Sequence, residues 1–487
     1  MNNTELKNKI SRKDTGLEQK KPIKIVQFGS GNFLRAFTDY VIEKMNQNSD
    51  FKAGIVNVKV TPSKGSFHQF EDQDNLYTVF VRGVKKGQTI DEKEIISSIQ
   101  KSINPYEDYQ AYKDLAKEED LQFVFSNTTE SGITFDESEN EITTVAHHNF
   151  PAKLTVLLYE RFKHFKGATD KGLTIIPCEL IENNAQTLKE YILDYAALWQ
   201  LETEFANWIN ENNSFHNTLV DRIVPGYPKD DADFYKNQLD YEDDLMVVAE
   251  AFLLWVIEGD KKLLEKIPFD KSNEPVLIVD DLQPYRTSKV RILNGAHTAM
   301  VPFSLLYGKE TVKDAIDDTF SGEFINKVVF DEIIPVLSLP EDELKLYAED
   351  VFDRFRNPFL KHFLSSIALN SISKFKVRVL PSFLEYVEKF GKLPQNLTFA
   401  FAALIRFYQG EFNGQELPVN DDQTIVNEFA AIWKSNDYDK IAEQVLQNVS
   451  YWEQDLTQVP DLKEQIAKAL VLIDEFGIEN AYKKYTI

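Results

Sequence analysis

Short apolar runs separated by helix-like stretches characterise the chain from residue 23 to about residue 280. Such alternation favours an α/β fold built on a mostly parallel sheet. The runs that we expect to form strands are Ile23–Phe28, Gly54–Val60, Tyr77–Val81, Leu121–Ser126, Leu173–Pro177 and Pro275–Val279. Two stretches between them, Phe37–Asn46 and Tyr106–Glu118, are expected to form helices.

Helical periodicity dominates the second half of the chain. The spacing of Leu245, Val248, Phe252, Trp255 and Val256 already predicts a helix beginning near Tyr241. The later segments predicted as helices are Val312–Thr319, Glu323–Val336, Pro358–Ser371, Phe383–Phe390, Leu397–Tyr408, Val426–Ser435 and Leu462–Phe476. This pattern predicts a mainly all-α domain over residues 281–487, which we expect to carry substrate-binding and catalytic residues.

A glycine turn links the first predicted strand to a predicted helix, Asn32 to Phe37. Gly29 permits a tight turn, and Gly31 would let the backbone approach a pyrophosphate. The third glycine of the usual fingerprint is replaced by Leu34, so an ordinary strand-to-helix turn is an equally good reading. The pattern indicates a Rossmann-like dinucleotide-binding domain over residues 21–280, preceded by a polar tail of residues 1–20. The segment after the second strand offers no acid that would favour NAD over NADP.

Two polar segments follow buried runs, at the strand ends where α/β sheets bind ligands. The first, Ser126 to Gly132, contains Asn127 and Thr128, and the second, Pro177 to Asn184, contains Cys178. An amide at such a position can donate a hydrogen bond to a developing oxyanion. Composition alone equally fits polar turns, with Cys178 as a small buried residue.

The segment from Lys289 to Thr298 carries the strongest chemical signal. On an α-helix, Asn294 and His297 would lie within about 60° of each other, whereas Lys289 would lie about 140° from Asn294. Lysine, amide and imidazole groups that converge would supply a proton donor, an oxyanion donor and an orienting group. The alternative is a surface lysine, a helix interrupted at Gly295 and a buried histidine.

Composition narrows the functional classes. The 487 residues include 54 Lys and Arg against 78 Asp and Glu, a formal charge of −24. This excess argues against nucleic-acid partners and against binding to a membrane surface. A single cysteine excludes an intramolecular disulfide and a thiolate cluster, and the chain has neither a signal-like segment nor an apolar run long enough to span a membrane. We therefore expect a cytoplasmic protein without a thiolate metal site.

Several segments in this order resemble the mannitol dehydrogenase family of polyol-specific long-chain dehydrogenases. They are Val26–Phe37, Ser126–Ile133, Ile175–Asn184, Val220–Pro225, Lys289–Thr298 and Lys374–Glu385. The Asn-Phe-Leu-Arg-Ala-Phe and Asn-Gly-Ala-His-Thr variants are similar to the tagaturonate branch of that family. The resemblance implies metal-independent, NAD-dependent reduction of D-tagaturonate to D-altronate in hexuronate catabolism. Reduction of fructuronate, oxidation of mannitol, and a catalytically dead nucleotide-binding sensor are the alternatives; the oligomeric state stays open.

The resemblance also implies roles for individual residues. Lys289 would be the general acid and base, Asn184 and Asn294 would steady the reacting oxygen, and His297 would orient the substrate. The implied substrate-binding residues are Asp221, Lys374 and Glu130. The implied cofactor-binding residues are Phe28, Gly29, Ser30, Gly31, Asn32, Phe33, Arg35, Asn127 and Thr128.

One departure from the mannitol-specific pattern concerns the substrate. Ser366 stands where those members have an arginine, eight residues before the lysine matching Lys374. A uronate carboxylate needs a cationic partner, and the sequence leaves five candidates unranked: Lys361, His362, Lys374, Lys376 and Arg378.

Overall fold

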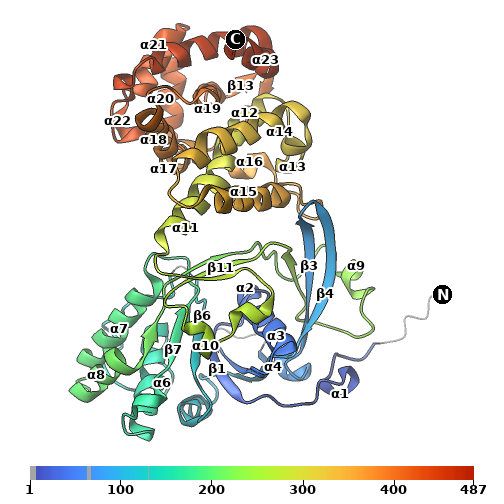
Figure 1. Ribbon diagram of the computed structural model, residues 1–487, viewed down its shortest axis with the longest axis vertical. Coiled ribbons are helices and arrows are strands. Elements are labelled where there is room, and N and C mark those ends of the chain that lie inside the picture. Colours follow the sequence, from blue (N-terminus) through green and yellow to red (C-terminus); the bar gives the residue numbers. More distant parts are fainter. Residues whose placement is uncertain (1–6, 63–66, 130) are drawn as a thin grey trace, which may run out of the picture. The chain divides into compact units, whose positions relative to one another are not determined.

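The structure is a computed structural model that describes residues 7–62, 67–129 and 131–487. The chain forms two compact units (Figure 1). The α/β unit comprises the residues up to Arg82 together with Ile90–Leu282. The helical unit comprises Gly83–Thr89 together with Gln283–Ile487.

A parallel sheet forms the centre of the α/β unit. Its strand order is β5-β2-β1-β6-β7-β8, and every neighbouring pair is parallel. The strands are β1 (Ile23–Phe28), β2 (Gly54–Val58), β5 (Ile99–Ile103), β6 (Phe123–Ser126), β7 (Thr174–Pro177) and β8 (Ser214–Phe215). The sheet confirms the predicted α/β class.

Side chains alternate between two apolar cores, one on each face of this sheet. Ile25 and Phe125 face the core that contains α3 (Thr38–Asn48). Val26 and Val124 face the opposite core. The helices of that second core are α5 (Tyr109–Asp114), α6 (Phe150–His164), α7 (Asn184–Leu198) and α8 (Thr203–Asn212) (Figure 1). Continuous apolar strands buried on both faces are typical of a parallel sheet.

Two smaller sheets correct the prediction of a helix from Tyr241. The first has the order β10-β3-β4 and the second β12-β11-β9. Their strands are β3 (Tyr77–Lys85), β4 (Gln88–Ile96), β9 (Thr218–Asp221), β10 (Val247–Glu250), β11 (Leu254–Glu258) and β12 (Val276–Val279). Every second residue from Leu245 to Ile257 lies in one core, which is the period of a strand. The helical spacing arose because nearly every position in this run is apolar, so both periods fit.

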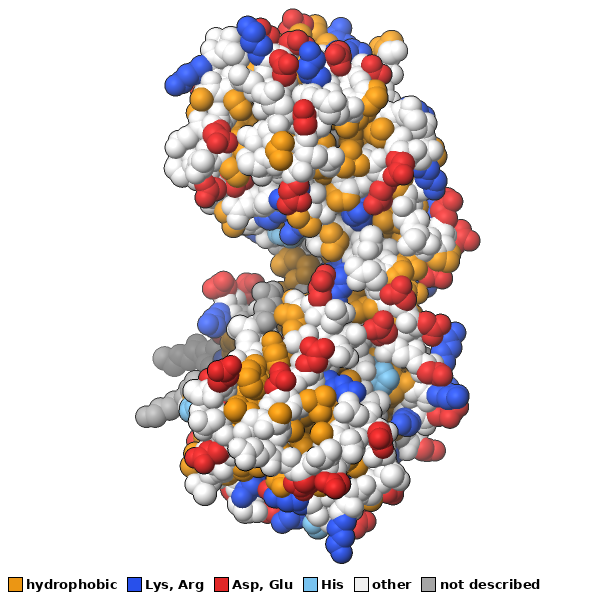
Figure 2. Space-filling view, turned by 90° about the vertical axis from the view of Figure 1, so that its left-hand side faces the viewer, with side chains coloured by type: hydrophobic (Ala, Val, Ile, Leu, Met, Phe, Trp, Pro, Cys, Tyr) orange, Lys and Arg blue, Asp and Glu red, His pale blue; other side chains and the backbone are white. Residues whose placement is uncertain are grey.

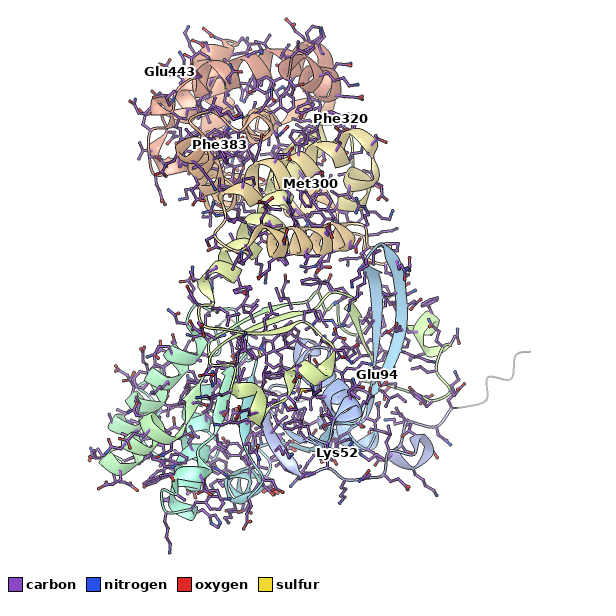
Figure 3. All side chains as sticks on the ribbon, in the orientation of Figure 1. Lys52, Glu94, Met300, Phe320, Phe383 and Glu443 are labelled. Atoms are coloured by element: carbon purple, nitrogen blue, oxygen red, sulfur yellow. The ribbon has the colours of Figure 1, made fainter. Side chains whose placement is uncertain are left out.

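Helices make up nearly all of the described part of the other unit, as predicted. They are α11 (Gln283–Ser288), α12 (Gly295–Leu306), α13 (Val312–Asp317), α14 (Thr319–Lys327), α15 (Glu341–Phe355), α16 (Leu364–Ile367), α17 (Ser371–Arg378), α18 (Leu380–Phe390), α19 (Gln395–Phe407), α20 (Gln423–Trp433), α21 (Tyr438–Leu446), α22 (Val449–Trp452) and α23 (Leu462–Tyr485). Met300 and Phe383 are fully buried in the single large core of this unit, whereas Glu443 lies on its surface (Figure 3).

The predicted helix Pro358–Ser371 is wrong over most of its length. Within this range only Leu364–Ile367 and Ser371, the first residue of α17, are helical, and Asn370 adopts a left-handed conformation with φ 54° just before α17. Phe363 pairs with Thr311 in an antiparallel bridge, and the carbonyl oxygen of His362 accepts a hydrogen bond from the backbone N–H of Val312 at 3.0 Å. Pairing with a distant segment therefore holds residues 362–363 extended, and sequence periodicity cannot reveal it.

Besides the π-helical segment η5 (Val328–Ile333) and several 3₁₀ turns, the two units contain further short elements. They are α1 (Arg12–Thr15), α2 (Asn32–Arg35), α4 (Phe67–Asp72), α9 (Ala232–Lys236), α10 (Leu263–Lys266), and the hairpin strands β13 (Glu411–Phe412) and β14 (Gln415–Glu416). Among the described residues, no helix is long and apolar enough to cross a membrane. Acidic side chains are spread over the visible face of each unit, with Lys and Arg interspersed (Figure 2).

Candidate functional site

The carboxyl ends of β1 and β6 form a candidate cofactor site within the α/β unit. These strands are neighbours at the position where the order of the sheet reverses, which is where open α/β sheets bind ligands. The backbone N–H of Asn127 donates to the carbonyl oxygen of Phe28 at 3.1 Å, so the two strand ends are joined. Gly29 has φ +119°, and a Cβ there would lie 2.9 Å from the carbonyl oxygen of Asn127. This turn therefore requires glycine for two separate reasons.

The next residues of the turn face open space. Gly31 precedes α2 as its N-cap, is exposed, and has nothing within 4 Å of a built Cβ. Asn32 is exposed and Ser30 partly so, whereas the side chain of Phe28 is buried in the core and can offer a ligand only its backbone. Phe33 stacks on Phe37 with ring centroids 4.8 Å apart.

Arg35 is used inside the α/β unit. Its guanidinium donates to Oδ1 of Asn32 at 2.6 Å and to the carbonyl oxygen of Leu245. The side chain is buried, and burial lowers its pKa. Arg35 therefore fixes the position of Asn32, so any role toward a cofactor would be indirect. The predicted helix is also shorter than expected, because α2 ends at Arg35 and α3 starts at Thr38.

Glu179, which the sequence analysis did not select, organises the segment after β6. Its carboxylate accepts hydrogen bonds from Ser126 Oγ at 2.9 Å and from the backbone N–H and Oγ1 of Thr128 at 3.0 and 2.9 Å. Asn127 Nδ2 donates to the carbonyl oxygen of Cys178 at 2.7 Å. Burial raises the pKa of Glu179 and of the Cys178 thiol, so the cysteine is an inert core residue. An acid two residues beyond a buried strand was the available signal for Glu179.

Asn184 lies at the start of α7 with 0% of its surface exposed. Its Nδ2 donates to the carbonyl oxygens of Pro177 and Glu179 at 3.2 and 3.0 Å. Its Oδ1 accepts from the backbone N–H groups of Ala185 and Thr218 at 2.9 and 3.0 Å. Both polar atoms thus hold neighbouring backbone together. The side chain has no exposed surface with which to touch a substrate, and we propose a supporting role for it.

The remaining residues predicted for this unit are Asp221 and Glu130. Asp221 is buried at the end of β9, opposite Leu254 on β11. Glu130 lies outside the described residues.

In the helical unit, Lys289–Asn294 forms a π-helical segment between α11 and α12. Its hydrogen bonds span five residues, as in the bond from the N–H of Gly295 to the carbonyl oxygen of Val290. Residues five apart therefore lie about one turn apart, which brings Lys289 and Asn294 onto one face. The helix is not interrupted at Gly295, where φ is −65° and ψ −46°. π-helical turns within α-helices occur frequently at functional sites.

His297 follows Asn294 by about one helical turn and lies near several cationic side chains. Burial and the nearby His362, Arg354, Arg378 and Lys374 lower its pKa well below the usual value, so the ring is neutral near pH 7. Its Nε2 is buried and has no hydrogen-bond partner among the described residues. A neutral imidazole with an unused nitrogen suits the predicted substrate-orienting role.

The sequence analysis missed Arg354. It lies on α15, is 8% exposed, and replaces an apolar residue on the face that contains Ala348, Val351 and Phe355. A charged residue at an apolar position of a helix was the signal that could have found it.

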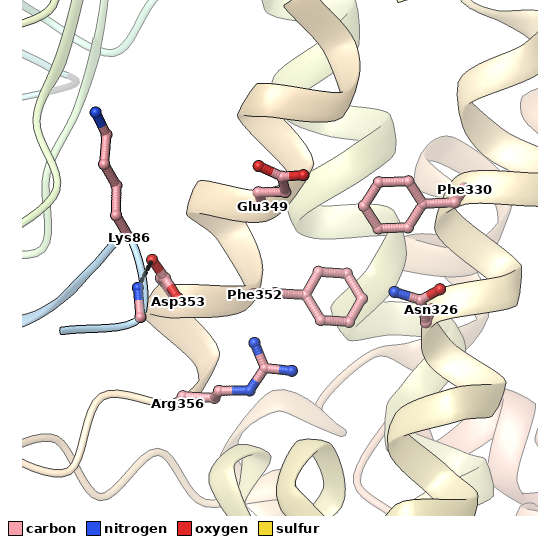
Figure 4. Close-up of a pocket in the computed structure, with 8 residues that line it drawn as sticks. Lys86, Asn326, Phe330, Glu349, Phe352, Asp353 and Arg356 are labelled. Carbon is pink, nitrogen blue, oxygen red and sulfur yellow. Dashed lines mark hydrogen bonds between the residues drawn. The ribbon is translucent and has the colours of Figure 1, made fainter. Parts of the chain in front are cut away.

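A surface cavity of about 270 Å³ in the helical unit is separate from these residues (Figure 4). It is lined by Lys86, Gly87, Asn326, Phe330, Glu349, Phe352, Asp353 and Arg356. None of the residues predicted from the sequence lines it. Among the described residues, no group of three or more His, Cys, Asp or Glu side chains could hold a metal ion.

Family comparisons cover almost the whole chain. Residues 23–271 match the model of the mannitol dehydrogenase Rossmann domain, and residues 281–474 match the mannitol dehydrogenase C-terminal domain. The altronate oxidoreductase of Bacillus subtilis (strain 168) is 47% identical over 96% of each chain. The altronate oxidoreductase of Yersinia enterocolitica is 46% identical over 96% of this chain and 97% of the relative.

Solved structures share the fold. A substrate-free D-sorbitol dehydrogenase aligns with a TM-score of 0.75 and 23% identity, covering 94% of this chain and 95% of that one. The mannitol 2-dehydrogenase of Pseudomonas fluorescens, solved with NAD and D-mannitol, aligns with a TM-score of 0.61 and 21% identity, covering 96% and 94%. Fold, matched domains and relatives agree, and the chain therefore belongs to the mannitol dehydrogenase family.

Proposed function

We propose that this protein interconverts D-tagaturonate and D-altronate with NAD(H). The observation that carries the proposal is the π-helical segment, which places a lysine and an amide on one face of a helix whose next turn carries a neutral histidine. These are the groups that reduction of a ketone requires. The substrate is inferred from the curated relatives named above, because both are altronate oxidoreductases.

The turn between β1 and α2 fits a dinucleotide. Gly31 and Asn32 are exposed at the sheet edge, and nothing lies within 4 Å of a Cβ built on Gly31, so a pyrophosphate could approach the backbone closely. Asn127 and Thr128 lie on the neighbouring strand end. When bound, NADH would supply the hydride for the carbonyl carbon.

Lys289 donates the proton in this mechanism. As the carbonyl carbon gains hydride, its oxygen gains an electron pair and takes a proton from the ammonium group of Lys289, which leaves neutral lysine and the alcohol. Asn294 donates a hydrogen bond to that oxygen while charge develops on it. We assign the orientation of the substrate to the neutral imidazole of His297. In altronate oxidation the same groups act in reverse, with Lys289 as the base.

Initial rates of NADH oxidation test the proposal, with tagaturonate, fructuronate and fructose as parallel substrates. We expect the highest kcat/KM with tagaturonate, and a lower value when NADPH replaces NADH. A preference for fructose would reject the sugar-acid assignment, and a preference for fructuronate would move the protein to a sister activity. Absence of any NADH oxidation, with NADH still bound, would favour a nucleotide-binding sensor.

A further inference from the structure

We propose that Arg378, assisted by Lys374 and His362, binds the carboxylate of the sugar acid beside His297. The inference deepens the proposed function and rests on it, since it assigns the groups that would distinguish a sugar acid from a neutral sugar. It also ranks the five cationic candidates that the sequence left equivalent.

Close packing of α17 on α12 places Arg378 beside the reacting segment. A Cβ built on Gly295 would lie 3.0 Å from the carbonyl oxygen of Arg378, so the backbone of Arg378 lies against the residue that follows Asn294. Lys374 and Arg378 are four residues apart on α17 and therefore share one face of that helix. Both side chains are partly exposed, so both are open to a ligand.

The extended segment 362–363 brings His362 to the same place. Its ring centroid lies 5.2 Å from that of His297, and Phe355 covers His297 at 4.4 Å. The site thus has an apolar wall and several nitrogen donors that come from α12, α17 and the 362–363 segment.

Positive charge is concentrated here in a protein whose net charge is −24. His362, Arg354, Arg378 and Lys374 each lower the pKa of His297. Burial and Arg378 lower the pKa of Lys374, and burial lowers that of Arg378, so the gathered cations are destabilised without an anion. Asp421 acts on Lys374 in the opposite direction, but its carboxylate also accepts from Tyr408 Oη.

A comparison of the contacts of the cationic candidates assigns Arg378 as the principal ligand of the carboxylate. Its guanidinium makes no hydrogen bond or ion pair with another described residue, whereas Lys374 Nζ donates to the carbonyl oxygen of Ile367 at 2.9 Å. Lys376 is paired with Glu453 at 2.7 Å, and Lys361 is exposed. A guanidinium binds a carboxylate through two parallel hydrogen bonds, a geometry that a neutral polyol cannot match.

The test compares Arg378→Gln and Arg378→Lys with Lys376→Gln, a matched control on the same helix. Initial rates are measured with tagaturonate, fructuronate and fructose at saturating NADH, after circular dichroism has shown that each variant is folded. We expect KM for tagaturonate to rise about 10- to 100-fold in Arg378→Gln, because a charge-assisted contact is lost. The value for Arg378→Lys should lie in between. Fructose kinetics should not worsen, and Lys376→Gln should match the wild type.

An unchanged KM for tagaturonate in Arg378→Gln would overturn the assignment. So would an equal loss with tagaturonate and fructose, since this indicates a structural role. If Arg378→Gln does not fold, the KM values of Arg378→Lys for tagaturonate and fructose are compared in the same way, and a selective rise for tagaturonate supports the assignment. If the wild-type enzyme does not reduce tagaturonate, the proposed substrate is wrong. In that case a selective loss of fructuronate reduction in Arg378→Gln would still support Arg378 as the carboxylate ligand, and no selective loss would reject it.

Discussion

Lys289 and Asn294 are the first and last residues of one π-helical segment, and its wide turn brings them to the same face of the helix. On an α-helix the same two residues would lie about 140° apart. The local backbone therefore decides whether the proton donor and the amide can reach one oxygen. This arrangement leads to two predictions.

Replacing Lys289 with alanine should lower kcat by at least about 100-fold, because a positioned general acid typically contributes 10²–10⁴ to the rate. NADH affinity, measured by fluorescence titration, should change little, because the turn at Gly31 is in the other unit. Near-wild-type turnover would reject Lys289 as the acid.

Deleting Val290 should convert the π-helical segment into α-helix in which Lys289 and Asn294 are four positions apart, about 40° around the axis, and therefore remain on one face. We expect the variant to turn over substrate faster than Asn294→Ala, because both groups can still reach one oxygen, and to retain helix content and Tm, because the α-helical hydrogen-bond pattern is the more regular one. Circular dichroism and steady-state kinetics check both parts. A folded deletion variant as slow as Asn294→Ala would show that a shared face for Lys289 and Asn294 is not sufficient for turnover.

The two glycines after β1 offer a matched pair of variants. Gly29→Ala places a side chain at φ +119°, 2.9 Å from the carbonyl oxygen of Asn127, and should destabilise the fold by about 1–3 kcal/mol. Gly31→Ala meets nothing within 4 Å and should keep its Tm. We expect Gly31→Ala to weaken NADH binding instead, since a methyl group would stand where the pyrophosphate approaches. Unchanged NADH affinity in Gly31→Ala would place the pyrophosphate elsewhere.

Glu332 gives a prediction about pH and stability. Its carboxyl accepts from the backbone N–H groups of Asn396 and Leu397, both at 2.7 Å, and burial raises its pKa to about 7. A raised pKa means that the stabilisation is fully present below the unfolded pKa of about 4.3 and is lost as pH rises through about 7.

Glu332→Gln should cost about 1–3 kcal/mol at pH 5, because the amide nitrogen cannot accept from the second backbone N–H, whereas the hydroxyl oxygen of the neutral carboxyl can. The difference from the wild type should shrink by pH 8. Urea denaturation at both values measures it, with Glu323→Gln as the exposed control that should show no trend over this interval. A difference that grows with pH would mean that the N–H groups favour the carboxylate more than burial disfavours it.

Sequence patterns identified the parallel strands because a strand buried on both faces is a short continuous apolar run, and most helices because burial of one stripe spaces apolar residues at the helical period. Where nearly all positions are apolar, the sequence fits both the strand period and the helix period. For this reason β10 and β11 were predicted as helix. His362 was placed on a helix for another reason, since its extended conformation depends on Val312, far away in the chain.

In the candidate site, too, residue type and spacing predicted some features, whereas others depend on the fold. Lys289, Asn294 and His297 could be selected from residue type and spacing, but not the π-helical turn that aligns Lys289 with Asn294. Glu179 and Arg354 were missed because each is a single charged residue whose importance lies in distant partners or in burial. The gathering of Arg378, Lys374 and His362 around His297 depends on helix packing, which no local pattern records.

The helical unit is discontinuous in sequence, because it includes Gly83–Thr89 as well as the residues from Gln283 onward. The backbone N–H of Gly87 donates to Asp353 Oδ2 at 3.0 Å, which ties the early segment to α15 (Figure 4). On the ribosome, this segment emerges long before the helices to which it binds. A gene cut at the boundary near residue 282 would remove it, so a C-terminal fragment expressed alone should be less stable than the same fragment supplied with a peptide of residues 83–89.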